Sequence, residues 1–166
     1  ALEVCNKLMA QDEVARSRQF PIRFLSAWRE IGSLRWAFAL ERALDHSLAN
    51  IPVLLGKTLI LVDWSGSMWE AMSGRSKRQR WEVATIFAAS LAKRAQHGEL
   101  VAYGSQYGAV DIHRPLLKIV EGAQNLGGTQ TMQTLAATYR GHDRVVIVTD
   151  EQAHDAGTPT PDVPIY

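Results

Sequence analysis

A short apolar run that ends abruptly in polar residues constrains the fold of this chain more than any other feature. The run 59–62 reads Leu-Ile-Leu-Val, carries no charge, and is followed directly by Asp63, Ser65 and Ser67. A continuous apolar run bounded by turn residues predicts a strand that is buried on both faces. Open α/β sheets bind their ligands beyond the carboxyl ends of such strands, so we expect a functional site here.

Two further stretches supply oxygen atoms of the same kind. The glycine-rich segment 125–131 carries Thr129 just before a helical pattern. The strand-like segment 144–150, which is apolar at 145–148, ends in Asp150. Carboxylate and hydroxyl oxygens are hard ligands that suit Mg²⁺, which keeps several waters and takes few protein charges. We therefore predict a site for Mg²⁺, or another divalent cation, made by Asp63, Ser65, Ser67, Thr129 and Asp150. In the structural alternative, a serine caps a helix and the two aspartates are ordinary strand-end residues.

From residue 58 onward, strand-like and helix-like patterns alternate along the chain. The predicted strands are 58–62, 99–103, an antiparallel edge strand 109–112, 145–149 and the start of another at 163–166. The predicted helices are one that begins at Trp81 and ends near Gly98, a short one at 116–120 and one around 135–139. Such alternation predicts an α/β fold with a doubly wound, mostly parallel sheet.

The first part of the chain has a different periodicity. Within residues 1–49, apolar side chains recur at helical spacing, with breaks at Pro21 and at Gly32-Ser33. We therefore divide the chain into a helical segment at 1–49, a linker at 50–57 and an α/β domain at 58–166.

Bulk composition excludes some classes of protein. The chain has 166 residues and a formal net charge of +1, which predicts no strong overall attraction to nucleic acid or to a membrane. The lone cysteine, Cys5, excludes an intrachain disulfide and fits a reducing compartment, so we expect a cytoplasmic location. No apolar run approaches the length of a membrane span. The first residue is alanine rather than methionine, so we expect a fragment of a longer protein.

The pattern Asp-x-Ser-x-Ser, then Thr, then Asp at a strand end resembles the metal-ion-dependent adhesion site of von Willebrand factor A domains. The resemblance implies a Rossmann-like fold and assigns the five oxygen-bearing residues to the metal. That family usually continues with a strand, a helix, a strand and a final helix. We therefore expect a fold truncated at its C-terminal end, with the missing elements supplied by another segment or chain. Gln130 departs from the family, which often has an acidic residue there.

The helical segment indicates which family of proteins with a von Willebrand factor A domain this chain resembles. Residues 12–21 resemble the end of the TROVE module shared by telomerase, Ro and vault proteins, and Gly56-Lys57 and Val148–Glu151 resemble Ro patterns on either side of the metal motif. In Ro proteins a ring of helical repeats runs directly into a von Willebrand factor A domain. The resemblance implies partners of three kinds: small noncoding Y RNAs, misfolded RNAs and, in bacteria, exoribonucleases. Most of the RNA-binding ring has no counterpart in this sequence.

Basic and aromatic residues follow the first predicted strand closely. Four cations lie between that strand and the next helix, namely Arg75, Lys77, Arg78 and Arg80. They could hold RNA phosphates, or they could belong to a solvated loop. Trp64 and Trp69 flank the predicted metal residues and could stack on a base or serve in packing.

Binding explains this residue pattern better than catalysis does. Catalysis would need a nucleophile with an adjacent base or a second metal, and no such pairing is visible in the sequence. Our first hypothesis is an RNA-binding Ro-like protein that is not an enzyme. The alternative is an interaction module that binds an acidic protein ligand through its metal, and a metal-assisted hydrolase is a third, weaker hypothesis.

Overall fold

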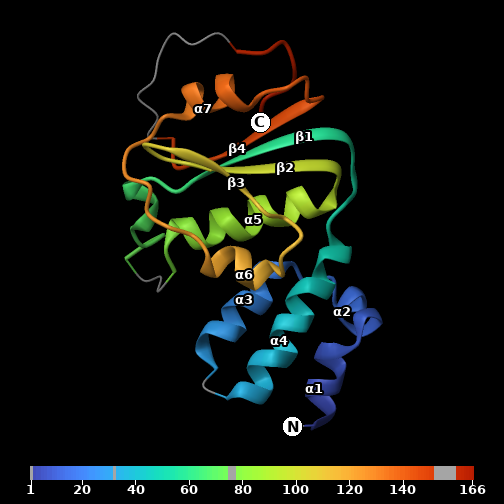
Figure 1. The fold of residues 1–166 in the computed structure, drawn as a ribbon. Coiled ribbons are helices and arrows are strands. Elements are labelled where there is room, and N and C mark those ends of the chain that lie inside the picture. Colours follow the sequence, from blue (N-terminus) through green and yellow to red (C-terminus); the bar gives the residue numbers. More distant parts are fainter. Residues whose placement is uncertain (1, 32, 75–77, 152–159) are drawn as a thin grey trace.

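The computed structural model describes residues 2–31, 33–74, 78–151 and 160–166, which form a layer of helices beside an α/β unit (Figure 1). The helical layer consists of α1 (Leu2–Met9), α2 (Gln11–Ser17), α3 (Pro21–Glu30), α4 (Leu34–His46) and the 3₁₀ helix η1 (Ser47–Asn50). Pro21 begins α3, where its missing N–H and fixed φ are favourable.

The α/β unit is built on a four-stranded sheet with the order β3-β2-β1-β4. The central strand β1 (Leu54–Asp63) pairs in parallel with β2 (Ala95–Tyr103) and with β4 (Arg144–Val148). The edge strand β3 (Tyr107–Val110) is antiparallel to β2. The predicted α/β class with a mostly parallel sheet, preceded by helices, is therefore confirmed.

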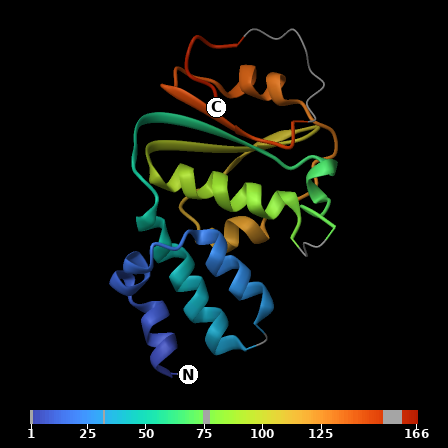
Figure 2. The same ribbon diagram turned by 180° about the vertical axis from the view of Figure 1, so that it is seen from behind.

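Helices cover both faces of this sheet. On one face lie α5 (Arg80–Arg94) and α6 (Leu116–Glu121), and on the other lies α7 (Thr131–Thr138) (Figures 1 and 2). Ile60 and Val62 of β1 belong to the core cluster on the α5 side, whereas Leu59 and Leu61 belong to the cluster beneath α7. All four side chains are fully buried, as the uninterrupted apolar run predicts.

Each strand begins earlier than the apolar pattern predicts, and the difference is largest, four residues, for β1 and β2. β1 starts at Leu54 rather than at residue 58, and β2 starts at Ala95 rather than at residue 99. The early part of β1 contains a register shift between Leu54 and Lys57, where Gly56 has a φ of +81° and donates its N–H to Gln96 Oε1 at 2.9 Å. Exposed residues alternate with half-buried ones there, and Gly56 and Lys57 separate Leu54 and Leu55 from the buried apolar run 59–62. The predicted linker at 50–57 therefore overlaps η1 and β1 and keeps only 51–53 outside both.

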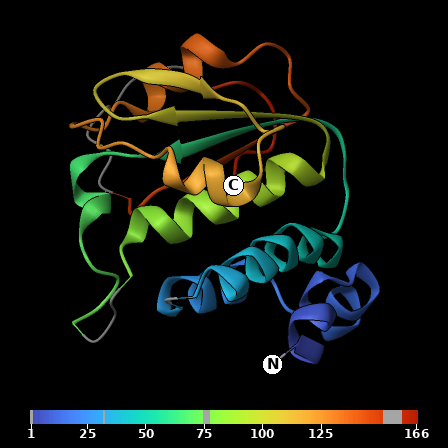
Figure 3. The same ribbon diagram turned by 60° about the horizontal axis from the view of Figure 1, so that its bottom comes forward.

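The helical layer packs against α5 and shares its core (Figure 3). Phe24 and Leu25 of α3 lie in the same cluster of buried residues as Ile60 of the sheet. Arg29 at the end of α3 pairs with Glu82 of α5 at 2.6 Å. The helices and the α/β unit therefore form a continuous hydrophobic core.

The last described residues lie beside β4. Ile165 forms a parallel bridge with Val145, and the Tyr166 carbonyl accepts the Ile147 N–H at 2.8 Å. The strand predicted to start at 163–166 is present only as this bridge. Among the described residues, no helix has the length and apolar character required to span a membrane.

Candidate metal centre

The three oxygen-bearing stretches of the sequence meet at the carboxyl edge of the sheet. Parallel pairing places Val62 of β1 beside Val148 of β4, so the residues that follow both strands emerge together. The glycine-rich loop joins them from a third direction. The Gly66 N–H donates to the Gly127 carbonyl at 2.6 Å, and the Leu126 N–H donates to the Trp64 carbonyl at 2.8 Å.

Asp63 is the centre of a hydrogen-bonded group at this edge. Its carboxylate is fully buried, and Oδ1 accepts the Ser65 N–H at 2.8 Å while Oδ2 accepts the Thr149 hydroxyl at 2.7 Å. The Ser65 and Ser67 hydroxyl oxygens lie 3.3 Å apart. These bonds fix the orientation of the carboxylate before any ligand arrives.

Thr149 was not among the site residues predicted from the sequence. Its position directly after the β4 run and before Asp150 is the only signal that pointed to it. Its hydrogen bond with Asp63 joins two residues separated by 86 positions, which only the parallel pairing of β1 and β4 brings together.

Backbone bonds hold the loop that contains Thr129 to the same edge. The Gly128 N–H donates to the Ser105 hydroxyl at 2.7 Å, and the Gln130 N–H donates to the Gly104 carbonyl at 3.1 Å. Thr129 itself is half-buried. The loop is thus held on both sides of the residue that the sequence assigns to the metal.

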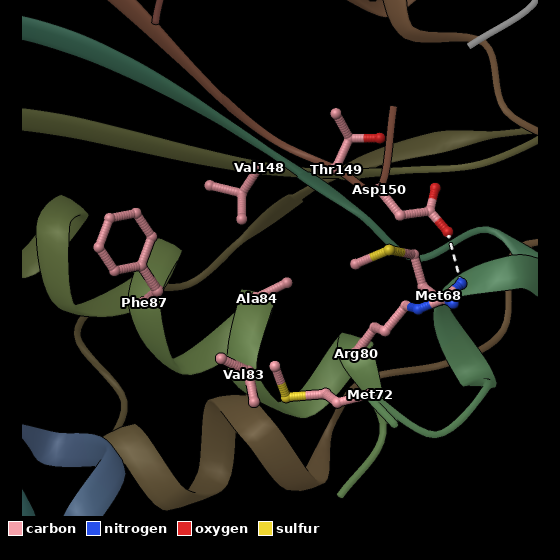
Figure 4. Close-up of a pocket in the computed structure, with 9 residues that line it drawn as sticks. All are labelled: Met68, Met72, Arg80, Val83, Ala84, Phe87, Val148, Thr149 and Asp150. Atoms are coloured by element: carbon pink, nitrogen blue, oxygen red, sulfur yellow. Dashed lines mark hydrogen bonds and ion pairs between the residues drawn. The ribbon is translucent and has the colours of Figure 1, made fainter. Parts of the chain in front are cut away.

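Asp150 has one oxygen in an ion pair and one with no partner. Its side chain is 11% exposed, and Oδ2 lies 3.1 Å from Arg80 Nη1 (Figure 4). No described residue donates a hydrogen bond to Oδ1, although that oxygen is buried. A buried carboxylate oxygen left without a partner is costly, so this atom favours a cation at the site.

The donor set fits a magnesium ion. Asp63 and Asp150 supply carboxylates, and Ser65, Ser67 and Thr129 supply neutral hydroxyls. Within the described residues, no three His, Cys, Asp or Glu side chains cluster as they would around zinc. A site with few protein charges and open positions for water is the kind that Mg²⁺ accepts.

Part of the predicted basic loop lies close to this site. Arg75 and Lys77 fall outside the described residues. On either side of them, the Met72 N–H donates to the Arg78 carbonyl at 2.9 Å, and Ala71 bridges Gln79 in antiparallel fashion. Arg80 faces Asp150 in this structure, so its guanidinium is already engaged.

The two tryptophans near the site have packing roles. Trp64 is 7% exposed and donates its indole N–H to the Thr85 hydroxyl at 2.8 Å. Trp69 stacks on Trp81 with ring centroids 4.6 Å apart. The packing interpretation of these residues therefore agrees with the structure.

Comparisons with known proteins identify a structural relative. The chain matches no protein-family model and no curated protein sequence. It is similar in structure to the Ro (RSR) protein of Deinococcus radiodurans, with a TM-score of 0.69 and 20% sequence identity. The match covers 98% of this chain and 36% of that protein, so the chain spans about a third of its length. The similarity includes both the helical layer and the α/β unit, and at the level of the fold it agrees with the resemblance to Ro proteins.

Proposed function

We propose that this chain is part of a Ro-like, RNA-binding protein whose α/β unit carries a divalent-metal site. One observation carries the proposal: the fold shared with the Deinococcus protein extends over 98% of the chain, and so includes α1 to α4. A von Willebrand factor A module of another kind would share only the α/β unit. The helical layer therefore favours the Ro-like interpretation over a general interaction module.

The expected partners follow from that interpretation. They are small noncoding RNA of the Y type, misfolded RNA, and an exoribonuclease that processes bound RNA in the cytoplasm. The net charge of +1 gives the chain no general affinity for nucleic acid. Recognition would therefore depend on local surfaces rather than on the overall charge of the chain.

The metal site would bind an acidic group rather than catalyse a reaction. Asp63, Ser65, Ser67, Thr129 and Asp150 would hold Mg²⁺, and Thr149 would orient Asp63 through its hydrogen bond. When bound, the ion supplies a positive centre with exchangeable water positions, which an incoming phosphate or carboxylate oxygen can take. Neutral hydroxyl ligands leave part of the ion's charge uncompensated, and this favours an anionic ligand.

The metal is tested by thermal unfolding in the presence and absence of magnesium. A ligand that binds only the folded state raises the midpoint, so we expect Mg²⁺ to stabilise the parent chain. Asp63→Ala should abolish that response. The control is Asp12→Ala, which removes an exposed carboxylate from α2 and should leave the response intact. A midpoint shift that survives in Asp63→Ala would contradict the assignment.

RNA binding is tested with the full-length protein. RNA that co-purifies with it should be enriched in small structured species when it is sequenced. A titration of labelled Y-like RNA at one salt concentration should show that Asp63→Ala loses no more than about tenfold in affinity, or about 1.4 kcal/mol, because phosphate contacts are many and individually modest. If the parent binds this RNA no better than an unrelated one, the Ro-like interpretation is wrong.

An acidic protein ligand is the second candidate, and one feature favours it. A groove of about 370 Å³ runs from Asp150 between α5 and the end of β4, and its apolar lining includes Met68, Met72 and Phe87 (Figure 4). A peptide could place a carboxylate on the metal and an apolar side chain in this groove. Metal-dependent binding of an acidic peptide, together with a lack of RNA binding by the full-length protein, would support this candidate.

A further inference from the structure

Arg80 makes an unusual set of contacts for a cation beside a predicted metal site. Its Nη1 atom lies 3.1 Å from Asp150 Oδ2, 3.3 Å from the Ser67 carbonyl oxygen and 3.4 Å from Glu70 Oε2. Two of these three groups belong to residues of the predicted metal set. The guanidinium therefore contacts two residues of the predicted metal set, Asp150 through its carboxylate (Figure 4) and Ser67 through its backbone carbonyl.

We propose that Arg80 is the resident counter-cation of Asp150 and that a divalent ion must displace it. This inference rests on the metal site of the proposed function. Asp150 is mostly buried and has one oxygen on Arg80 and one without a partner among the described residues. A guanidinium and a divalent ion on the same buried carboxylate repel each other, because little water lies between them to screen the charges. Metal binding and the Arg80–Asp150 pair therefore compete.

The position of Arg80 on its helix supports this competition. Arg80 is the first residue of α5, where the helix dipole disfavours a cation. The Asp150 carboxylate offsets that unfavourable position while the metal is absent. Once a divalent ion neutralises Asp150, the interaction that holds the guanidinium weakens.

Glu70 provides the place to which Arg80 would move. Its side chain is 69% exposed, and its backbone carbonyl accepts the Arg80 N–H at 3.1 Å, so the two residues stay adjacent. A shift of the guanidinium from Asp150 towards Glu70 takes it to the exposed rim of the site. There it can meet the same anionic ligand that the metal attracts, since guanidinium groups bind phosphate and carboxylate through paired hydrogen bonds.

The test compares magnesium affinities by isothermal titration in variants of equal charge. Arg80→Gln removes the competing cation, and we expect affinity for Mg²⁺ to rise about fivefold or more, the lower end of typical coupling between two ligands of one site. Lys118→Gln removes the same charge from α6, where Lys118 is exposed and pairs with Glu121, and it should change affinity less than twofold. Equal affinities in the two variants, or a loss of affinity in Arg80→Gln, would overturn the competition.

A second measurement uses the unsubstituted chain, so the result does not depend on how well a variant folds. The side-chain Nε–H resonance of Arg80 should shift in a ¹⁵N correlation spectrum as magnesium saturates the site, while that of Arg16 on α2 should not. An unmoved Arg80 resonance under saturating metal would show that the ion pair persists, and it would overturn this inference alone. If magnesium binds neither the parent nor Arg80→Gln, the metal site of the proposed function fails, and the competition fails with it.

Discussion

Two threonines fix the loop that follows β1. The Thr149 hydroxyl donates to Asp63, and the Thr85 hydroxyl accepts the indole N–H of Trp64. Thr149 thus orients the central carboxylate, and Thr85 ties the next residue of the loop to α5. Both bonds join side chains from different elements, so single substitutions can test them.

Replacement of Thr85 by valine should destabilise the protein. Thr85 and the Trp64 indole are buried, and the substitution keeps the shape of the side chain but removes the acceptor. We expect the free energy of unfolding to fall by about 1–3 kcal/mol, the cost of a buried donor left without a partner. Urea denaturation measures this change. Thr85→Ser keeps the hydroxyl and should lose clearly less, and equal losses in the two variants would assign the effect to packing.

Gly104 allows the glycine-rich loop to approach the end of β2. A Cβ at this position would lie 2.7 Å from the Leu126 carbonyl oxygen, so Gly104→Ala must displace the loop that carries Thr129. We expect a loss of about 1–3 kcal/mol in stability, as for other overpacked sites, and a weaker magnesium response. Gly108→Ala is the control, because nothing lies within 4 Å of its added Cβ. If Gly104→Ala and Gly108→Ala have the same stability and the same magnesium response, the close approach of the glycine-rich loop to Gly104 is contradicted.

At the scale of elements, the basic loop between β1 and α5 is held at its base. The bond from the Met72 N–H to the Arg78 carbonyl and the bond from the Arg80 N–H to the Glu70 carbonyl close its two sides. With Arg80 engaged by Asp150, the remaining residues predicted to bind phosphate are Arg75, Lys77 and Arg78.

These three cations are tested by the salt dependence of RNA binding in the full-length protein. If they bind phosphates, replacing all three with glutamine should reduce the slope of log affinity against log salt by about 0.7–0.9 for each phosphate that is no longer neutralised. Lys118→Gln removes an exposed cation of α6 that pairs with Glu121; it is the control and should leave the slope unchanged. If the triple variant has the same slope as the unsubstituted protein, the three cations do not contact phosphates and belong to a solvated loop.

At the scale of the whole molecule, the helical layer and the α/β unit are joined by a common core. Leu25 of α3 is 2% exposed and belongs to the cluster that reaches Ile60 in the sheet. The division into residues 1–49 and 58–166 therefore reflects the change from helical to strand-like periodicity in the sequence. Because the two segments pack against each other in one core, we expect them to unfold together.

Leu25→Ala tests this coupling. A leucine truncated in a well-packed core costs about 2–5 kcal/mol, and the loss should appear in a single transition. Urea unfolding followed by far-ultraviolet circular dichroism and by tryptophan fluorescence should give coincident curves in the parent and in the variant. Leu34→Ala is the control, since that side chain is 91% exposed. Separate transitions, with only the helical signal lost early, would show that the two parts are independent.

Much of this fold was determined by local sequence. The uncharged run 59–62 can be buried on both faces only in a sheet covered by helices, and its abrupt end at Asp63 places polar oxygens at the sheet edge. Pro21 likewise marks the start of α3 through its own backbone conformation. These features depend on neighbours in sequence, so periodicity and turn chemistry were sufficient to predict them.

Other features depended on residues far apart in the chain, and only the tertiary structure decided them. The early start of β1 includes a register shift beside Gly56, whose N–H donates to Gln96, and Gly56-Lys57 interrupts the apolar pattern there. Thr149 reaches Asp63, and Arg80 reaches Asp150, only because parallel strands and α5 bring them to one edge. Sequence alone therefore predicted a set of oxygens for the candidate site, whereas long-range packing decided how these side chains are oriented and brought Thr149 and Arg80 to them.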